Sequence, residues 1–149
     1  MGAEPYYYFV PYQPDLAAAL QALRQREFEA GRYNPVMPFL ADHLPLGPDS
    51  PAPGRQHASI ADALEAADAD GTRSILDIES LSDTPGLGVA VKLSDQTLSR
   101  LYGTTHPSRA QVEAAMDFLD DIERGQAIYV VLYDGAAPSE ILFAGYSCD

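Results

Sequence analysis

The chain has one cysteine, no tryptophan and one lysine among its 149 residues. A single cysteine cannot form an internal disulfide bond, which excludes the small disulfide-stabilised secreted scaffolds. No apolar run approaches the roughly 20 residues that cross a bilayer, and the N-terminus lacks the pattern of a signal peptide. We therefore expect a cytoplasmic protein without a membrane span. With 46% hydrophobic residues, the chain can bury an ordinary core as one domain over residues 1–149.

Basic residues are also scarce. Nine Lys and Arg stand against twenty-two Asp and Glu, so the formal net charge is -13. Residues 1–58 carry six acids and four Arg (net -2), whereas residues 59–149 carry sixteen acids and five bases (net -11). Such a charge repels nucleic-acid phosphates and anionic lipid and attracts a cationic partner. We expect a basic protein partner and neither nucleic-acid nor membrane binding; a surface charged only for solubility is the alternative.

Recognised catalytic and cofactor motifs are missing as well. The sequence contains no G-x-S-x-G elbow, no H-E-x-x-H metal motif, no P-loop and no G-x-G-x-x-G frame. Cys148 lies one residue from the C-terminus, where order is poor. The Asp and His residues of the 34–57 segment lack the spacing of a compact metal site. We therefore expect no metal and no cofactor, and the patterns do not favour an enzyme.

What is present is a series of short elements punctuated by Gly and Pro. We expect strands within 4–12, 73–81, 86–93 and, as a final pair, 126–146, and helices over 14–31, 59–71, 94–103 and 106–125. Ser59 and Ser94 are the predicted helix caps, and Gly31, Gly71, Gly103 and Gly125 the predicted stops. Six of the twelve prolines lie in 34–57, which predicts a long surface wrap.

The connections between the strands predict the fold class. The strands over 73–81 and 86–93 are joined through a short Pro- and Gly-containing segment, which favours a hairpin. The final two strands are joined in the same way. We therefore expect a single α+β two-layer domain: a mostly antiparallel sheet of about five strands, helices packed on one face, and a Pro-rich wrap at about 34–57.

The main candidate site is a polar cluster at the end of the first helix. On a helical wheel Glu27 falls on the same stripe as Leu20 and Leu23, so its carboxylate points at the core. Burying a lone carboxylate costs many kcal/mol, so Glu27 must be paired, protonated or lining a cavity. A ligand pocket or a structural ion network would each contain the polar residues that surround it, which are Arg24, Arg26, Arg32, Tyr33 and Asn34.

A second polar strip is expected on the strand predicted over 73–81. By period-two alternation, Arg73, Asp77 and Glu79 would share one strand face. We expect Glu27 to pair with Arg73 or Arg24. Asp77 and Glu79 would then line the same cleft or an exposed face of the sheet.

The predicted long helix over 106–125 carries the candidate partner-binding surface. Its acidic face consists of Glu113, Asp117, Asp120 and Asp121, opposite an apolar stripe. Like charges at spacings of three and four oppose each other by about 0.2 to 0.5 kcal/mol per pair. A basic partner would relieve this repulsion; an ordinary solvated face is the alternative.

Several segments together resemble a family of small acidic bacterial proteins. They are REFEAGRYNPV, HASIADALEAADADGTRSILDI, LYGTTHPSRAQVE, DDIERGQAIYVVLY and EILFAGYS. The resemblance covers most of the chain and implies a bacterial cytoplasmic setting, with no activity or catalytic residue to carry over.

Two functional hypotheses follow from charge and motifs. The first is a non-enzymatic binding protein with an acidic surface, of the immunity-protein or inhibitor type, that masks a basic protein partner. The alternative is a small-molecule-binding domain or minor enzyme whose pocket is the polar cluster over residues 24–34.

Overall fold

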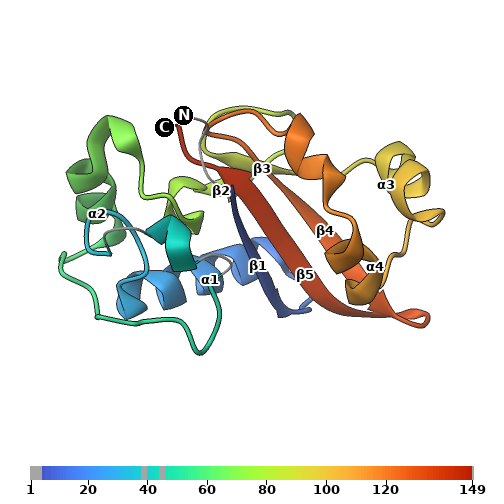
Figure 1. Cartoon of the computed structure of the whole chain (residues 1–149), viewed down its shortest axis with the longest axis horizontal. Coiled ribbons are helices and arrows are strands. Elements are labelled where there is room, and N and C mark those ends of the chain that lie inside the picture. The colour runs from blue at the N-terminus through green and yellow to red at the C-terminus, as the bar shows by residue number, and fades with distance from the viewer. Residues whose placement is uncertain (1–4, 38–39, 44–45, 149) are drawn as a thin grey trace.

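The computed structural model of the chain describes residues 5–37, 40–43 and 46–148 (Figure 1). A five-stranded sheet runs in the order β1-β5-β4-β3-β2. The strands are β1 (Pro5–Pro11), β2 (Ser80–Leu81), β3 (Val89–Lys92), β4 (Ala127–Asp134) and β5 (Ala137–Tyr146). β1, β5 and β4 pair antiparallel, and β4, β3 and β2 pair parallel. The predicted α+β class is confirmed, with a mixed sheet in which the antiparallel ladders are the longer ones.

Helix α1 (Leu16–Ala30) covers one face of the sheet. The Asp15 side chain caps it by accepting a hydrogen bond from the Ala18 amide, and Gly31 ends it in the left-handed conformation. Its buried leucines pack on alternate strand residues, which share one sheet face because strand side chains alternate. This core cluster contains Leu20, Leu23, Tyr6, Tyr8, Val10, Ile75, Ile78, Ile141 and Phe143.

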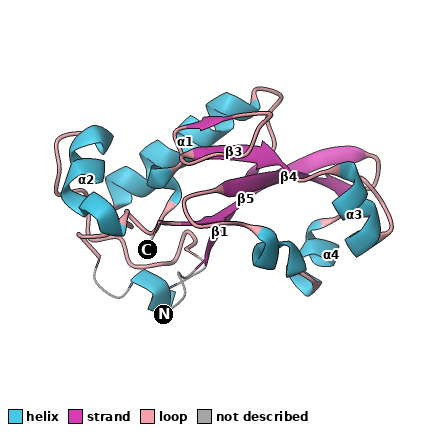
Figure 2. Ribbon diagram, turned by 90° about the horizontal axis from the view of Figure 1, so that it is seen from above, coloured by secondary structure: helices cyan, strands magenta, loops and turns pink. Residues whose placement is uncertain are grey.

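The opposite face of the sheet is covered as well. α3 (Asp95–Tyr102), α4 (Arg109–Ala114) and the 3-10 turn that follows α4 lie on that side, away from α1 (Figure 2). Their core cluster contains Leu98, Val112, Phe118, Ile128, Val130, Leu132, Leu142 and Ala144. We expected helices on one face only. The difference arises because β4 and β5 are apolar on both faces, and each face must be kept from water.

The strand predicted over 73–81 is wrong for most of its length. Ser74 begins a 3-10 turn, Ile75–Asp77, by accepting a hydrogen bond from the Leu76 amide. Only Ser80–Leu81 pairs in the sheet, parallel to β3, so the predicted hairpin is also wrong. Side-chain bonds from Ser and Asp to the local backbone compete with strand pairing, and here they close the chain into a turn.

The long helix predicted over 106–125 breaks after α4. Ala115 has an extended backbone, and a separate 3-10 turn follows at Asp117–Asp121. The Ala115 carbonyl accepts a hydrogen bond of 2.5 Å from the Tyr102 hydroxyl of α3 instead of one from the next helical turn. This contact, together with repulsion among the acids, favours the break. The shorter helices α2 (Ile60–Ala67) and α3 begin at their predicted caps, Ser59 and Ser94.

Buried side chains and a backbone hydrogen bond join the Pro-rich wrap to the core on the α1 side. Leu40–His43 forms a 3-10 turn, and Met37 and Leu46 are buried in the α1 cluster. The Gly54 amide donates a hydrogen bond of 2.8 Å to the Ala30 carbonyl at the end of α1. Among the described residues, no helix has the length and apolar character that a bilayer crossing requires.

Gly31 and Gly103 give a matched test of how closely the wrap approaches α1. Both end a helix with positive φ, 75° and 72°, a conformation that costs other residues about 1 to 2 kcal/mol. A Cβ on Gly31 would lie 2.3 Å from the Gly54 carbonyl oxygen, whereas one on Gly103 would meet nothing within 4 Å. We expect Gly31→Ala to lower the free energy of unfolding by about 1 to 3 kcal/mol more than Gly103→Ala. Urea denaturation measures the difference, and equal losses would contradict this packing.

Candidate functional site

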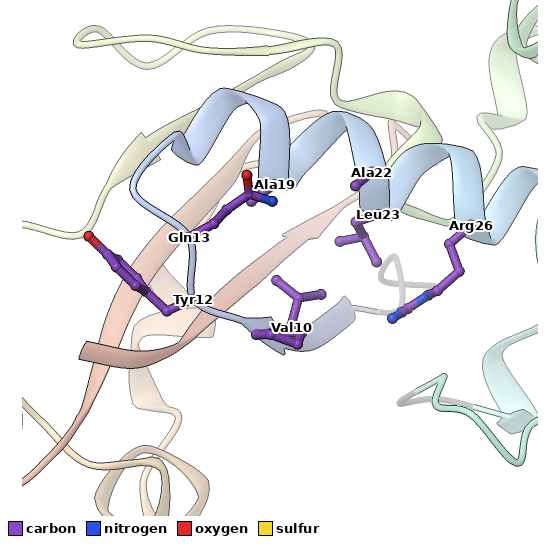
Figure 3. A pocket seen from close by; sticks show the side chains of 8 residues that line it. Val10, Tyr12, Gln13, Ala19, Ala22, Leu23 and Arg26 are labelled. Carbon is purple, nitrogen blue, oxygen red and sulfur yellow. The ribbon is translucent and has the colours of Figure 1, made fainter. Parts of the chain in front are cut away.

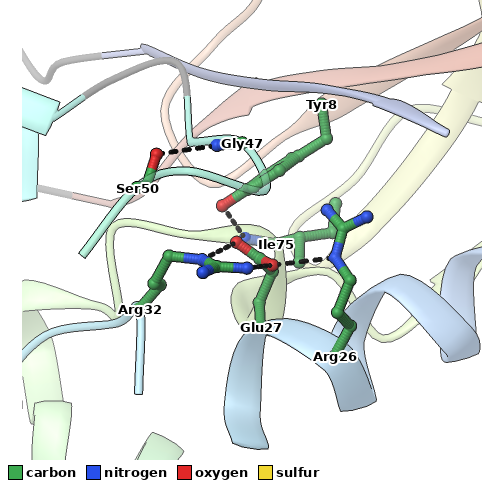
Figure 4. Close-up of polar contacts among 7 residues, drawn as sticks. All are labelled: Tyr8, Arg26, Glu27, Arg32, Gly47, Ser50 and Ile75. Carbon is green, nitrogen blue, oxygen red and sulfur yellow. Dashed lines mark hydrogen bonds and ion pairs between the residues drawn. The ribbon is translucent and has the colours of Figure 1, made fainter. Parts of the chain in front are cut away.

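Glu27 lies at the centre of a buried ion network (Figure 4). The Arg32 guanidinium donates a hydrogen bond to each carboxylate oxygen, from Nε to Oε1 at 3.0 Å and from Nη2 to Oε2 at 2.8 Å. Arg26 adds a third bond, from its Nε to Oε2 at 3.0 Å. The side chains of Glu27 and Arg32 are 0% and 6% exposed, and that of Arg26 is 42% exposed. As the helical wheel predicts, Glu27 points into the protein.

The network satisfies the Glu27 carboxylate and leaves one positive charge over. A bidentate guanidinium–carboxylate pair is the strongest ordinary arrangement of these groups. The hydrogen bond to Glu27 is the main cause that raises the pKa of Arg32, against the opposing effect of burial. Two guanidinium groups surround one carboxylate, so the network has a net charge of +1. The charge of Arg32 balances that of Glu27, and the charge of Arg26 is not neutralised.

Tyr8 closes the network on the sheet side. Its hydroxyl accepts a hydrogen bond of 3.3 Å from the Ile75 amide and lies beside Glu27 (Figure 4). Burial raises the pKa of Tyr8 far above its usual range, and the Glu27 charge adds to the effect. The hydroxyl is thus held neutral and serves as a structural contact between β1, α1 and the 75–77 turn.

The expected pairing of Glu27 with Arg73 or Arg24 is wrong. Arg24 lies on a neighbouring line of α1 and donates to the Gln21 side chain at 2.9 Å and to the Leu76 carbonyl at 3.2 Å. Burial lowers the pKa of Arg24. Arg73 has a positive φ of 55°, and the side-chain hydrogen bonds that the Glu27 carboxylate accepts come from Arg26 and Arg32.

Asp77 and Glu79 do not share a cleft with Glu27. Asp77 Oδ1 accepts from the Thr72 amide at 2.9 Å and the Thr72 hydroxyl at 2.8 Å, and its Oδ2 accepts from the Ser147 hydroxyl. This carboxylate ties the turn before β2 to the end of β5. Glu79 is exposed, and its backbone carbonyl accepts from the Gln21 amide group at 2.8 Å.

Tyr33 and Asn34 form a third, separate set of contacts. Tyr33 is fully buried, stacks on Phe28 with ring centroids 5.8 Å apart, and places its hydroxyl 2.7 Å from His57 Nδ1. The Asn34 side chain donates to the Gly71 carbonyl at 3.0 Å. The predicted polar cluster is therefore divided among distinct structural networks, because helix geometry sends successive side chains in different directions.

The acidic face is distributed over two elements. Glu113 lies on α4 and pairs with Arg109 at 3.0 Å, whereas the three Asp residues belong to the following 3-10 turn. Asp121 approaches Arg100 at 3.9 Å with both side chains largely exposed. Asp117 and Asp120 are exposed and make no ion pair within the described parts of the chain. The fold thus leaves these carboxylates on the surface.

A cavity beside Arg26 includes one residue of the predicted polar cluster, and its other lining residues were not foreseen from the sequence. It has a volume of about 240 Å³ and lies between α1 and the end of β1 (Figure 3). Its lining consists of Val10, Pro11, Tyr12, Gln13, Ala19, Ala22, Leu23 and Arg26. The alanines of α1 were the available signal, since small side chains on a helix facing a strand leave space between the two. No group of His, Cys, Asp and Glu within the described residues could hold a metal ion.

Comparison with known proteins places the chain in no family. No family model matches the sequence, no curated protein matches it, and no solved structure matches its fold.

Proposed function

We propose that the chain is a non-enzymatic binding protein whose acidic surface covers a basic site on a protein partner, in the manner of an immunity protein or inhibitor. The observation that carries the proposal is the exposure of the acidic face, in which Asp117 and Asp120 make no ion pair with another described residue. A concentrated charge on an exposed surface steers an oppositely charged partner and sets its orientation. The bacterial cytoplasmic setting implied by the family resemblance is part of the proposal.

The contacts of the polar cluster agree with a non-enzymatic role. Glu27, Arg32 and Tyr33 are buried and already bonded within the protein. A catalytic acid, base or nucleophile must instead reach a substrate at hydrogen-bond distance. Small-molecule binding has its support in the cavity beside Arg26 rather than in the 24–34 cluster as a whole, and it is a separate proposal below.

A pair of neutralised variants tests the role of the acidic face. Asp117→Asn with Asp120→Asn removes two exposed charges from it, and Asp83→Asn with Asp134→Asn removes two exposed charges elsewhere. We expect the first pair to slow association with the basic protein partner about 3- to 10-fold at low salt. The control pair should change the rate less than twofold.

The salt dependence of the wild-type protein completes the measurement. Surface plasmon resonance with the purified partner should show a falling association rate as ionic strength rises, because salt screens exposed charges. An association rate that does not change with ionic strength, or equal effects of the two variant pairs, would rule out the acidic face as the docking surface.

A further inference from the structure

The Arg26 pocket, defined by the eight residues that line the cavity beside Arg26, has apolar walls and one cationic end. Val10, Ala22 and Leu23 contribute aliphatic groups from β1 and α1. Arg26 is the single charged residue of the lining. Pockets for small organic ligands combine such apolar walls with a few placed polar groups that orient the ligand.

The guanidinium of Arg26 retains unused binding capacity. Only its Nε is engaged, with Glu27 Oε2 at 3.0 Å, and its two Nη groups donate to no described residue. Both carboxylate oxygens of Glu27 also accept hydrogen bonds from Arg32. Glu27 therefore holds the Arg26 side chain in place without neutralising the whole network, and the terminal N–H groups remain as a fork for a second anion.

The lining residues set the length of the pocket. Figure 3 shows Arg26 at one end and Tyr12 and Gln13 at the other, with Val10 and Leu23 pointing into the space between them. Along α1 the pocket extends from Ala19 to Arg26, a rise of about 10 Å for seven residues. Ala19 and Ala22 keep this stretch open because their side chains are small.

We propose that the Arg26 pocket binds a small monocarboxylate with an unbranched apolar tail. The ligand carboxylate accepts hydrogen bonds from the Arg26 Nη groups, and a chain of about eight carbons, the carboxylate carbon included, extends along the 10 Å toward Tyr12. An inorganic anion would leave the apolar walls uncovered, and a neutral amphiphile would leave the guanidinium fork unused. This proposal is independent of the acidic face.

Calorimetric titration with octanoate tests the proposal directly, with 1-octanol as the neutral probe of equal length. We expect octanoate to bind at one site at least tenfold more tightly than 1-octanol. Arg26→Gln should weaken octanoate binding at least tenfold, and Arg26→Lys should recover part of it by restoring the charge. Ala22→Leu fills part of the pocket while keeping the Arg26 side chain and should also weaken binding at least tenfold.

Arg100→Gln is the matched control, since it removes one exposed guanidinium far from the pocket and should change octanoate affinity less than twofold. Melting curves show which variants are folded. Arg26→Gln should fold, because the two hydrogen bonds from Arg32 to Glu27 do not involve Arg26. The proposal is overturned if octanoate shows no saturable binding up to about 10 mM. A dissociation constant above that concentration corresponds to a binding free energy weaker than about -3 kcal/mol. Equal losses in Arg26→Gln and Arg100→Gln, or unchanged binding in Ala22→Leu, would overturn it as well.

Discussion

Replacing Glu27 with Gln is expected to lower the free energy of unfolding by about 3 to 5 kcal/mol, the usual cost of breaking one side of a buried ion pair. The change leaves the guanidinium of Arg32, 6% exposed, without the carboxylate that accepts its two hydrogen bonds. Because the side chains of Glu27 and Arg32 are almost fully buried, bulk water has little access to the vacated position. Urea denaturation monitored by circular dichroism measures the loss.

Glu29 provides the control for this experiment. It lies two residues further along α1, is exposed, and accepts only a hydrogen bond from Gln25. Glu29→Gln removes the same charge and should change the free energy of unfolding by less than about 0.5 kcal/mol. Comparable losses in the two variants would show that net charge, rather than the buried pair, sets the stability.

A double variant separates the interaction energy of the Glu27–Arg32 pair from the cost of burying a charge without a partner. Glu27→Leu with Arg32→Met replaces both charged groups by apolar ones of similar length. We expect it to be more stable than Glu27→Leu alone, because removing both partners leaves no uncompensated buried charge. A double variant less stable than both single ones would mean that the two residues act through separate contacts.

The second large effect is a loss of stability at alkaline pH. Tyr6 and Tyr8 are 0% and 1% exposed on β1, and burial raises the pKa of both hydroxyls well above the ordinary value of 10. Asp77 adds to the shift of Tyr6, and Glu27 to that of Tyr8. Below pH 10 both states of the protein keep these hydroxyls protonated, so the stability is fully present.

Above pH 10 the unfolded chain releases the two protons and the folded chain retains them, so unfolding becomes more favourable as pH rises. Each tyrosine contributes up to about 1.4 kcal/mol per pH unit, or about 3 kcal/mol for the pair. Because half of the unfolded-state tyrosines are still protonated at pH 10, we expect the free energy of unfolding to fall by about 2 kcal/mol between pH 10 and 11 and to approach the full slope above that. A flat stability profile over this range would contradict the burial of the two side chains.

Tyr6→Phe isolates one of the two contributions. The Tyr6 hydroxyl is buried and has no hydrogen-bond partner among the described residues, so its removal should leave stability at pH 7 unchanged or slightly higher. The alkaline slope should fall by the contribution of one tyrosine, leaving those of Tyr8 and of Tyr102, whose pKa burial raises to about 12. Tyr8→Phe differs at pH 7, since it also loses the bond from the Ile75 amide and should cost about 1 kcal/mol.

Local sequence signals were sufficient for most of the elements. The caps at Ser59 and Ser94 and the helix ends at Gly31 and Gly103 depend on contacts within three or four residues, so they could be predicted without the fold. The inward direction of Glu27 follows from the helical period in the same way. The strands β1, β4 and β5 were predictable from their apolar and aromatic runs.

Contacts between distant segments determined the rest. Asp77 accepts a hydrogen bond from Ser147, and Tyr102 donates one to the Ala115 carbonyl. These contacts accompany a turn and a helix break where the residue pattern predicted a strand and a continuous helix. The Arg26 pocket likewise exists because α1 lies across the end of β1.

The sequence by itself determined that a carboxylate at position 27 is buried and must have a cationic partner, because the helical period and the cost of an unpaired buried charge are local properties. Only the tertiary structure decided that Arg32 and Arg26 are the partners. Several arginines lie within reach along the chain, and the path of the backbone after Gly31 selects among them. The same path leaves the outer nitrogens of Arg26 facing an apolar pocket.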